Sequence, residues 1–215
     1  MSRLARIAAA MLSLFSCAAS FAEEPVRVFA AASLTNVLTE IAAQKPDVVF
    51  AFFAGGGAVK FVKDYDAAGL KKSIPLVGSG FLTDGTLEAQ GASAQGLITA
   101  LHYGDNIETP RNTAFRNKFA VANKVNPDVY ALQGYDAAQM LAIGLAAVKG
   151  DTSKKDALYA AMNKAQIDSP RGKFTLSPQR NPTQDFYVRE VKGNYNVVTG
   201  VAVKALADPG RGCKP

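Results

Sequence analysis

Apolar and polar residues alternate along this chain in a pattern that predicts strands and helices in turn. Short apolar runs predict strands at residues 26–30, 48–53, 75–78 and 96–103. Apolar residues at helical spacing predict helices at residues 34–43, 58–68, 113–122, 128–149 and 157–164. Strands and helices in this order are typical of α/β proteins, whose parallel sheets are flanked by helices.

Local signals add detail to this pattern. The run at 48–53 is apolar at every position, which predicts a central strand covered on both faces. Ser33 stands in N-cap position before the first helix, and Ser153 with Asp156 fits a capping box before the last. Further β-prone runs separated by turn residues follow residue 172, at 173–176, 186–188 and 197–201.

The N-terminus has the organisation of a secretory signal peptide. Arg3 and Arg6 precede a short apolar run at 7–19, and small residues lead to a cleavage site after Ala22. The run is shorter than the ~20 apolar residues that span a bilayer, so we expect a periplasmic protein that does not span the membrane. An alternative is lipid attachment at Cys17. Cleavage after Ala22 leaves one cysteine, Cys213, without a partner in the chain.

Charge and composition argue against several function classes. The formal net charge is +6, but basic pairs such as Lys71-Lys72 are short and bounded by acidic and apolar residues. No basic cluster interleaved with aromatic residues is present, so nucleic acid is not an expected partner. The single histidine, His102, has no nucleophile motif near it, and no metal-ligand spacing or nucleotide fingerprint occurs. We therefore expect no enzymatic activity, cofactor or metal.

The strongest candidate for binding is the glycine run that begins at Gly55. It follows the apolar run at 48–53 and precedes a helix, and two interpretations stay open. The glycines form a tight turn, or they let a carboxylate approach backbone N–H groups at the helix N-terminus. Ser79, Gly80 and Phe81 follow the next strand and would lie beside this turn. Aromatic residues that form either a pocket wall or the core are Phe52, Phe53, Phe81 and Tyr130.

From residue 45 onward the sequence carries a series of motifs in a fixed order. They are PDVVFAFFAGG at 46–56, YDAAGL at 65–70, IPLVGSG at 74–80, NPDVYALQGYDA at 126–137 and DSPRG at 168–172. In these motifs the chain resembles the C-terminal half of the branched-chain amino-acid type of periplasmic solute-binding protein, the receptor of an ABC importer. The resemblance covers about four-fifths of the chain.

A complete receptor of this type has two Rossmann-like lobes that close on a solute and deliver it to an inner-membrane ABC permease. The resemblance implies that this chain holds this type I architecture incompletely, as Rossmann-like parallel sheets with flanking helices. The implied ligand-binding residues on one lobe are Phe53, Ala54, Gly55, Ser79, Gly80 and Phe81, and on the other Tyr130 and Gln133. Receptors for amino acids tend to place an acidic residue near the position of Gly80. Because Ser79, Gly80 and Phe81 carry no charge, the ligand is expected to be an aromatic or other carboxylic acid, with an amino acid as the alternative.

Residues 23–44 differ from the rest. The segment VFAAASLTNVL at 28–38 resembles the first strand and helix of a periplasmic molybdate-binding protein, in which the residue matching Ser33 helps to hold the oxyanion. The expected organisation is therefore a signal peptide (1–22), a molybdate-receptor-like segment (23–44) and a partial solute-binding protein (45–215). One lobe edge buries little of a ligand, so we hypothesise weak or no binding and a tendency to aggregate. A remnant without activity and a molybdate receptor are the alternative functions.

Overall fold

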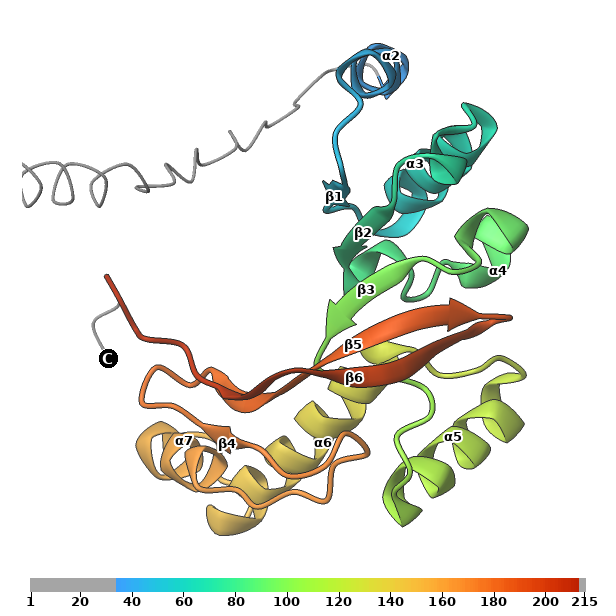
Figure 1. Cartoon of the computed structure of the whole chain (residues 1–215). Helices are drawn as coiled ribbons and strands as arrows, with labels where there is room; N and C mark the ends of the chain where they lie inside the picture. The colour runs from blue at the N-terminus through green and yellow to red at the C-terminus, as the bar shows by residue number, and fades with distance from the viewer. Residues whose placement is uncertain (1–33, 213–215) are drawn as a thin grey trace, which may run out of the picture. The chain divides into compact units, whose positions relative to one another are not determined.

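The computed structural model describes residues 34–212, and all structural statements below refer to them. A six-stranded sheet with the order β1-β2-β3-β5-β4, in which β6 also pairs with β5, organises this part of the chain. The strands are β1 (Val49–Ala51), β2 (Leu76–Ser79), β3 (Ile98–Leu101), β4 (Thr175–Leu176), β5 (Pro182–Lys192) and β6 (Tyr195–Leu206). The helices are α2 (Leu34–Gln44), α3 (Gly55–Ala67), α4 (Leu87–Gln90), α5 (Pro110–Asn123), α6 (Val129–Ala147) and α7 (Lys155–Asn163) (Figure 1). Short 3-10 turns are η1 (Leu70–Lys72), η2 (Gly80–Leu82) and η3 (Gly91–Ala94).

The predicted parallel sheet is confirmed for β1, β2 and β3, which pair in parallel. The last strands differ, because β5 runs antiparallel to β3 and β6 runs antiparallel to β5. The short turn between Lys192 and Tyr195, where Gly193 has a φ of 59°, reverses the chain and makes β6 antiparallel to β5. The fold is therefore α/β with a mixed sheet.

Most predicted helices form within a few residues of their expected ends. Helix α5 begins at Pro110 after Thr109, whose side chain accepts a hydrogen bond from the backbone N–H of Asn112. The capping box expected before α7 is wrong. Ser153 donates its hydroxyl hydrogen bond to Asp151 at 2.6 Å, and the N-cap of α7 is Lys154. Ser33 and the strand expected at 26–30 lie outside the described residues.

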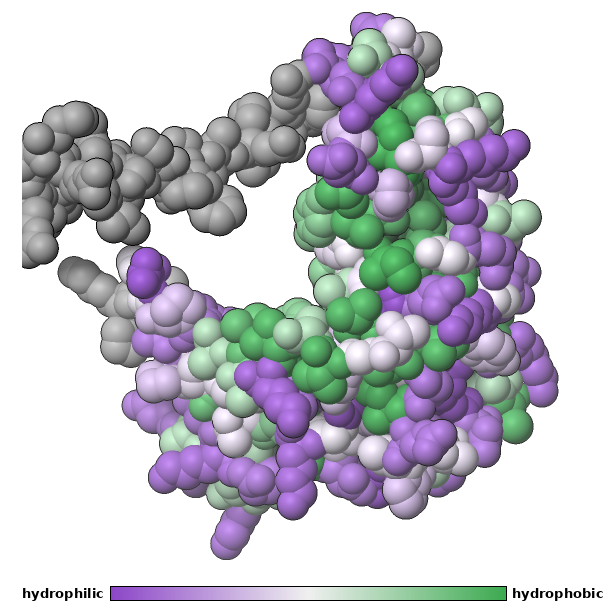
Figure 2. Space-filling model, in the orientation of Figure 1, coloured by the Kyte–Doolittle hydropathy of each residue, from purple (hydrophilic) through white to green (hydrophobic). Residues whose placement is uncertain are grey.

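The run at 48–53 does not form a central strand covered on both faces. Only Val49–Ala51 is a strand, and among residues 34–212 it pairs with β2 alone. Phe50 is 67% exposed and Phe52 is 68% exposed. Across the paired strands, Phe50 aligns with Val77, and Val77 aligns with the exposed Ile98. Figure 2 shows hydrophobic side chains gathered on the surface over these strands.

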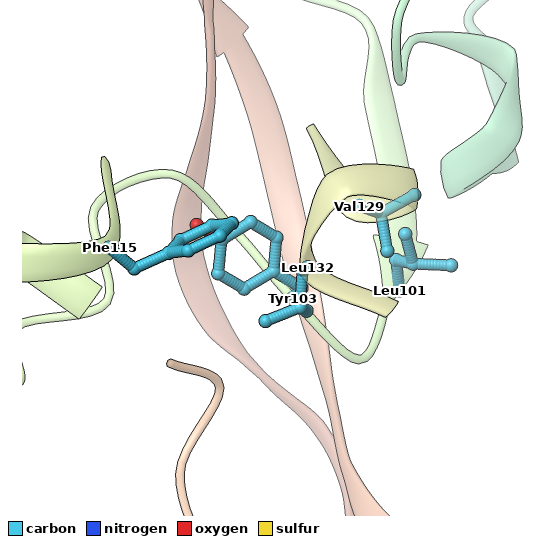
Figure 3. Packing of buried hydrophobic residues seen from close by; sticks show 5 residues of the cluster. All are labelled: Leu101, Tyr103, Phe115, Val129 and Leu132. Carbon is cyan, nitrogen blue, oxygen red and sulfur yellow. The ribbon is translucent and has the colours of Figure 1, made fainter. Parts of the chain in front are cut away.

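The core near the candidate site forms where β3 continues into the chain leading to α5. Figure 3 shows this cluster, which consists of Leu101, Tyr103, Phe115, Val129 and Leu132. Its polar group is satisfied, because the buried Tyr103 hydroxyl donates to the side chain of Asn112 at 2.7 Å. Phe81 packs against the same cluster. The core therefore supports the first turn of α6 and the turn after β2 together. Among the described helices, none has both the length and the apolar character needed to cross a membrane.

Candidate ligand-binding site

The residues after β1 lead directly into α3. Ala54 is the extended N-cap residue, and Gly55 is the first helical residue with a φ of 55°, a conformation that favours glycine. Ala54 and Gly55 are exposed, and the first turn of α3 contains no acidic side chain. The N–H groups at this 13-residue helix start therefore face an environment suited to an anion. Phe53 turns away to stack on Phe61 within α3, at 4.8 Å between ring centroids.

The turn after β2, residues 79–81, lies beside the end of β1. Ser79 is half-buried, and its hydroxyl oxygen has no hydrogen-bond partner within the chain. Gly80 is buried, and its carbonyl oxygen accepts hydrogen bonds from the backbone N–H groups of Thr83 and Asp84 at 3.1 and 3.0 Å. Glycine is required here by packing, because a Cβ atom at Gly80 would lie 2.5 Å from Cβ of Leu101. Gly80 thus shapes the turn without presenting itself to solvent.

Three aromatic rings form a continuous row across this edge, which we call the aromatic row: Phe52, Phe81 and Tyr130. Phe52 meets Phe81 edge-to-face at 6.3 Å, and Phe81 stacks on Tyr130 at 5.8 Å. Tyr130, the second residue of α6, is 46% exposed. Burial, followed by the charges of Asp84 and Asp128, raises the pKa of Tyr130. Gln133 is exposed one turn further along α6.

The structure brings Phe81 and Tyr130 into contact. Ser79 and Gly80 adjoin Phe81, although Gly80 is enclosed by the core. Phe53 packs against Phe61 of α3, and its neighbour Phe52 takes the exposed position beside Phe81. The resulting surface is open. Two hollows, each of about 730 Å³, lie elsewhere. One is lined by residues including Arg111 and Lys173, and the other by residues including Asp84 and Asp128.

A buried ion pair lies beneath the turn after β2. Arg189 of β5 is fully buried, and its Nη2 atom lies 2.8 Å from Oδ2 of Asp84. Burial raises the pKa of Asp84 to about 6, although the charge of Arg189 and its hydrogen bond act to lower that pKa. Sequence reasoning missed both residues. The available signal was a basic residue at an inward position of a strand, between the half-buried Tyr187 and the buried Val191.

His102 is a buried, neutral residue. The His102 ring is buried, lies edge-on to Phe186 at 6.0 Å, and has no hydrogen-bond partner at Nε2. Burial, followed by the charges of Arg171 and Arg189, lowers its pKa to about 4, so the ring is neutral at pH 7. Among residues 34–212 no group of three or more His, Cys, Asp or Glu side chains could hold a metal ion.

Sequence comparison assigns this architecture to a family. The family described as periplasmic binding protein matches residues 18–196. The chain belongs to the periplasmic binding protein family. A Leu/Ile/Val-binding protein homologue of Brucella melitensis is 34% identical over 151 residues, which are 66% of this chain and 38% of that protein.

Solved structures give the same assignment. A solute-binding protein of an ABC transporter from R. palustris, crystallised with benzoate, is 49% identical with a TM-score of 0.82. The match covers 88% of this chain and 52% of that one. Another from Rhodopseudomonas palustris BisB5, crystallised with 3,4-dihydroxybenzoic acid, is 29% identical with a TM-score of 0.75, covering 83% of this chain and 50% of that one. The chain thus spans about half the length of these solute-binding proteins, which supports the predicted incomplete architecture.

Proposed function

We propose that this chain is the substrate-binding component of an ABC importer and that its ligands are aromatic carboxylic acids. The observation that carries the proposal is the aromatic row of Phe52, Phe81 and Tyr130 at the carboxyl ends of the parallel strands. Open α/β sheets bind ligands at this edge. A planar ring could stack on the exposed face of Phe52 and contact Phe81, which leaves its carboxylate near the start of α3.

The start of α3 favours a carboxylate as the ligand group. Ser79, Gly80 and Phe81 are uncharged, and Asp84 at the end of this turn is buried and paired with Arg189. A carboxylate can accept hydrogen bonds from the N–H groups at the start of α3. The benzoate and dihydroxybenzoate complexes of the similar proteins support this ligand class.

Affinity is expected to be low. Small-molecule sites usually bury 70–90% of their ligand, whereas the row is an open surface that contacts one side of a ring. We therefore expect a dissociation constant in the millimolar range, equivalent to roughly 4 kcal/mol of binding free energy. Delivery to an inner-membrane ABC permease forms part of the proposal. A remnant that binds no solute is the alternative, and a branched-chain amino-acid receptor is a second one that the Leu/Ile/Val-binding homologue favours.

Thermal melting in the presence of benzoate, 4-hydroxybenzoate, leucine or molybdate tests the proposal. A ligand at ten times its dissociation constant stabilises the folded state by about 1.4 kcal/mol, which raises the Tm of a chain of this size by about 3–6 °C. We expect this rise with the two aromatic acids alone. A rise with leucine or molybdate alone would overturn the ligand class, and no rise with any of them would support the remnant.

We also propose that the protein is exported to the periplasm. The residues that indicate this lie outside the described range. The N-terminal organisation predicts removal of residues 1–22 and a periplasmic protein that begins at Glu23. Mass determination of the protein recovered from the periplasm of an expressing bacterium tests this. An N-terminus at Cys17 carrying lipid would instead establish the alternative.

A further inference from the structure

Arg189 connects three separate segments of the chain from a fully buried position in β5. Its Nη1 atom donates to the carbonyl of Tyr103 at 2.9 Å, and its Nη2 atom donates to the carbonyl of Gly80 at 3.2 Å. Nη2 also donates to the hydroxyl of Thr99 at 3.0 Å and lies 2.8 Å from Oδ2 of Asp84. One guanidinium group therefore fixes both ends of the turn that carries Phe81.

Asp84 extends this connection to α6. Its Oδ1 atom accepts a hydrogen bond from the backbone N–H of Val129 at 3.3 Å. Val129 is the first residue of α6, and Tyr130 is the second. The single carboxylate of Asp84 thus joins the guanidinium that holds the Phe81 turn to the helix start that carries Tyr130.

Other contacts confine the same turn. The Thr83 hydroxyl donates to the side chain of Asn196 in β6 at 2.6 Å, which fixes the far end of the turn. At its near end Gly80 is packed so closely that a Cβ atom would lie 2.6 Å from Nη2 of Arg189. These contacts hold the turn against β3 and β5, and the Arg189–Asp84–Val129 connection joins it to α6 alongside the core packing of Phe81.

We infer that Arg189 and Asp84 are positioning residues that set the separation of the Phe81 and Tyr130 rings and thereby the selectivity for planar aromatic acids. This inference rests on the proposed function. Stability alone does not account for the pair, because well-packed apolar residues in place of a buried ion pair often leave a fold as stable or more stable. What an apolar pair cannot supply is the directed acceptor for the Val129 N–H and the donors for the Gly80 and Tyr103 carbonyls.

The test uses two variants that break the connection in different ways. The double variant Arg189→Met/Asp84→Leu removes both charges together and leaves neither unpaired. Val129→Pro removes the N–H that Asp84 accepts, at the first helical position, where proline is well tolerated. It also replaces the fully buried Val129 side chain by a smaller ring, so the core cluster is probed alongside by Val129→Ala, which keeps the N–H. The extended backbone of Asp128 at φ −110° and ψ −170° is compatible with a following proline. The matched control is Glu190→Gln/Lys192→Gln, which removes an exposed ion pair on the same strand.

Two readouts separate positioning from folding and from the proposed function. Nuclear Overhauser contacts between the Phe81 and Tyr130 rings report their separation without any ligand, and benzoate titration reports binding. We expect both variants to melt cooperatively, lose the ring contact and weaken benzoate binding at least fivefold, while the control changes neither. Retention of the ring contact in Val129→Pro, or in a folded double variant, would overturn the inference. If the wild type shows the contact between the Phe81 and Tyr130 rings but binds no benzoate, the proposed function alone is refuted.

Discussion

Replacing Gly80 by alanine tests whether the turn that carries Phe81 is as tightly enclosed as the structure shows. The added Cβ would lie 2.5 Å from Cβ of Leu101 and 2.6 Å from Nη2 of Arg189, distances that real Cβ atoms essentially never show. Leu101 belongs to the core cluster, and its Cβ cannot move without its backbone. Arg189 can withdraw only by giving up its hydrogen bond to the Gly80 carbonyl.

Two contributions destabilise the folded state of Gly80→Ala, and one stabilises it. Overpacking a close-packed site costs about 1–3 kcal/mol. Loss of a charged hydrogen bond costs about 1.5–3 kcal/mol, but the two costs are not additive, because a withdrawn Arg189 side chain relieves part of the overpacking. Alanine also restricts the unfolded chain, which stabilises the fold by about 0.4–1 kcal/mol. The expected net loss is about 2–3 kcal/mol. For a domain of this size that lowers the Tm by about 4–12 °C.

Circular dichroism at 222 nm during heating measures this change, and Gly134→Ala is the matched control. Gly134 lies inside α6, and a Cβ there meets nothing within 4 Å. Alanine should therefore stabilise that position by about 0.5–1 kcal/mol through helix propensity. The reasoning is refuted if Gly80→Ala melts at or above the wild-type temperature while the control behaves as expected.

Further predictions address burial and charge elsewhere. Burial lowers the pKa of His102 from its ordinary 6.5 to about 4, so the unfolded chain takes up this proton first and the fold loses stability as pH falls from 6.5 toward 4. His102→Gln should remove about 3 kcal/mol of acid sensitivity in urea unfolding between those pH values, and an unchanged pH profile would contradict this. Oδ2 of Asp136 lies 3.0 Å from Nε of the buried Arg171 side chain. Asp136→Ala leaves that charge unpaired and should lower the free energy of unfolding in urea by about 3–5 kcal/mol. A decrease below 1 kcal/mol would show that the pair is solvated. Phe50 is exposed on an apolar sheet face, so Phe50→Lys should reduce self-association in analytical ultracentrifugation without lowering the Tm. Unchanged self-association would show that the chains associate through another surface.

The elements that the sequence predicted well are those whose signal is local. The parallel strands β2 and β3 and the helices α5 and α6 follow from apolar periodicity. Their N-cap residues, Thr109 and Asp128, were not predicted. The fully apolar run at 48–53 was misjudged, because coverage of a strand depends on which neighbours pair with it. Here β2 is the partner of β1 on one side, and Phe50 stays exposed. No local pattern carries that information.

The candidate site shows the same division. Phe81 and Tyr130 were expected near one another, and their rings stack. The exchange of Phe53 for Phe52 depends on where β1 ends, a boundary that periodicity does not define. Arg189 and the Gly80 carbonyl are 109 positions apart in the sequence, and they meet because β5 pairs with β3 in reverse. Such long-range polar contacts follow from the topology and cannot be derived from either segment alone.

Saturation-transfer NMR with benzoate and leucine, on the wild type and on Phe81→Ala, tests the central claim most directly. It detects millimolar binding and identifies which ligand protons contact the protein. The account predicts transfer to the ring protons of benzoate in the wild type, much weaker transfer in Phe81→Ala, and none to leucine. Transfer to leucine at equal or greater strength, or benzoate binding that is unaffected by Phe81→Ala, would contradict it.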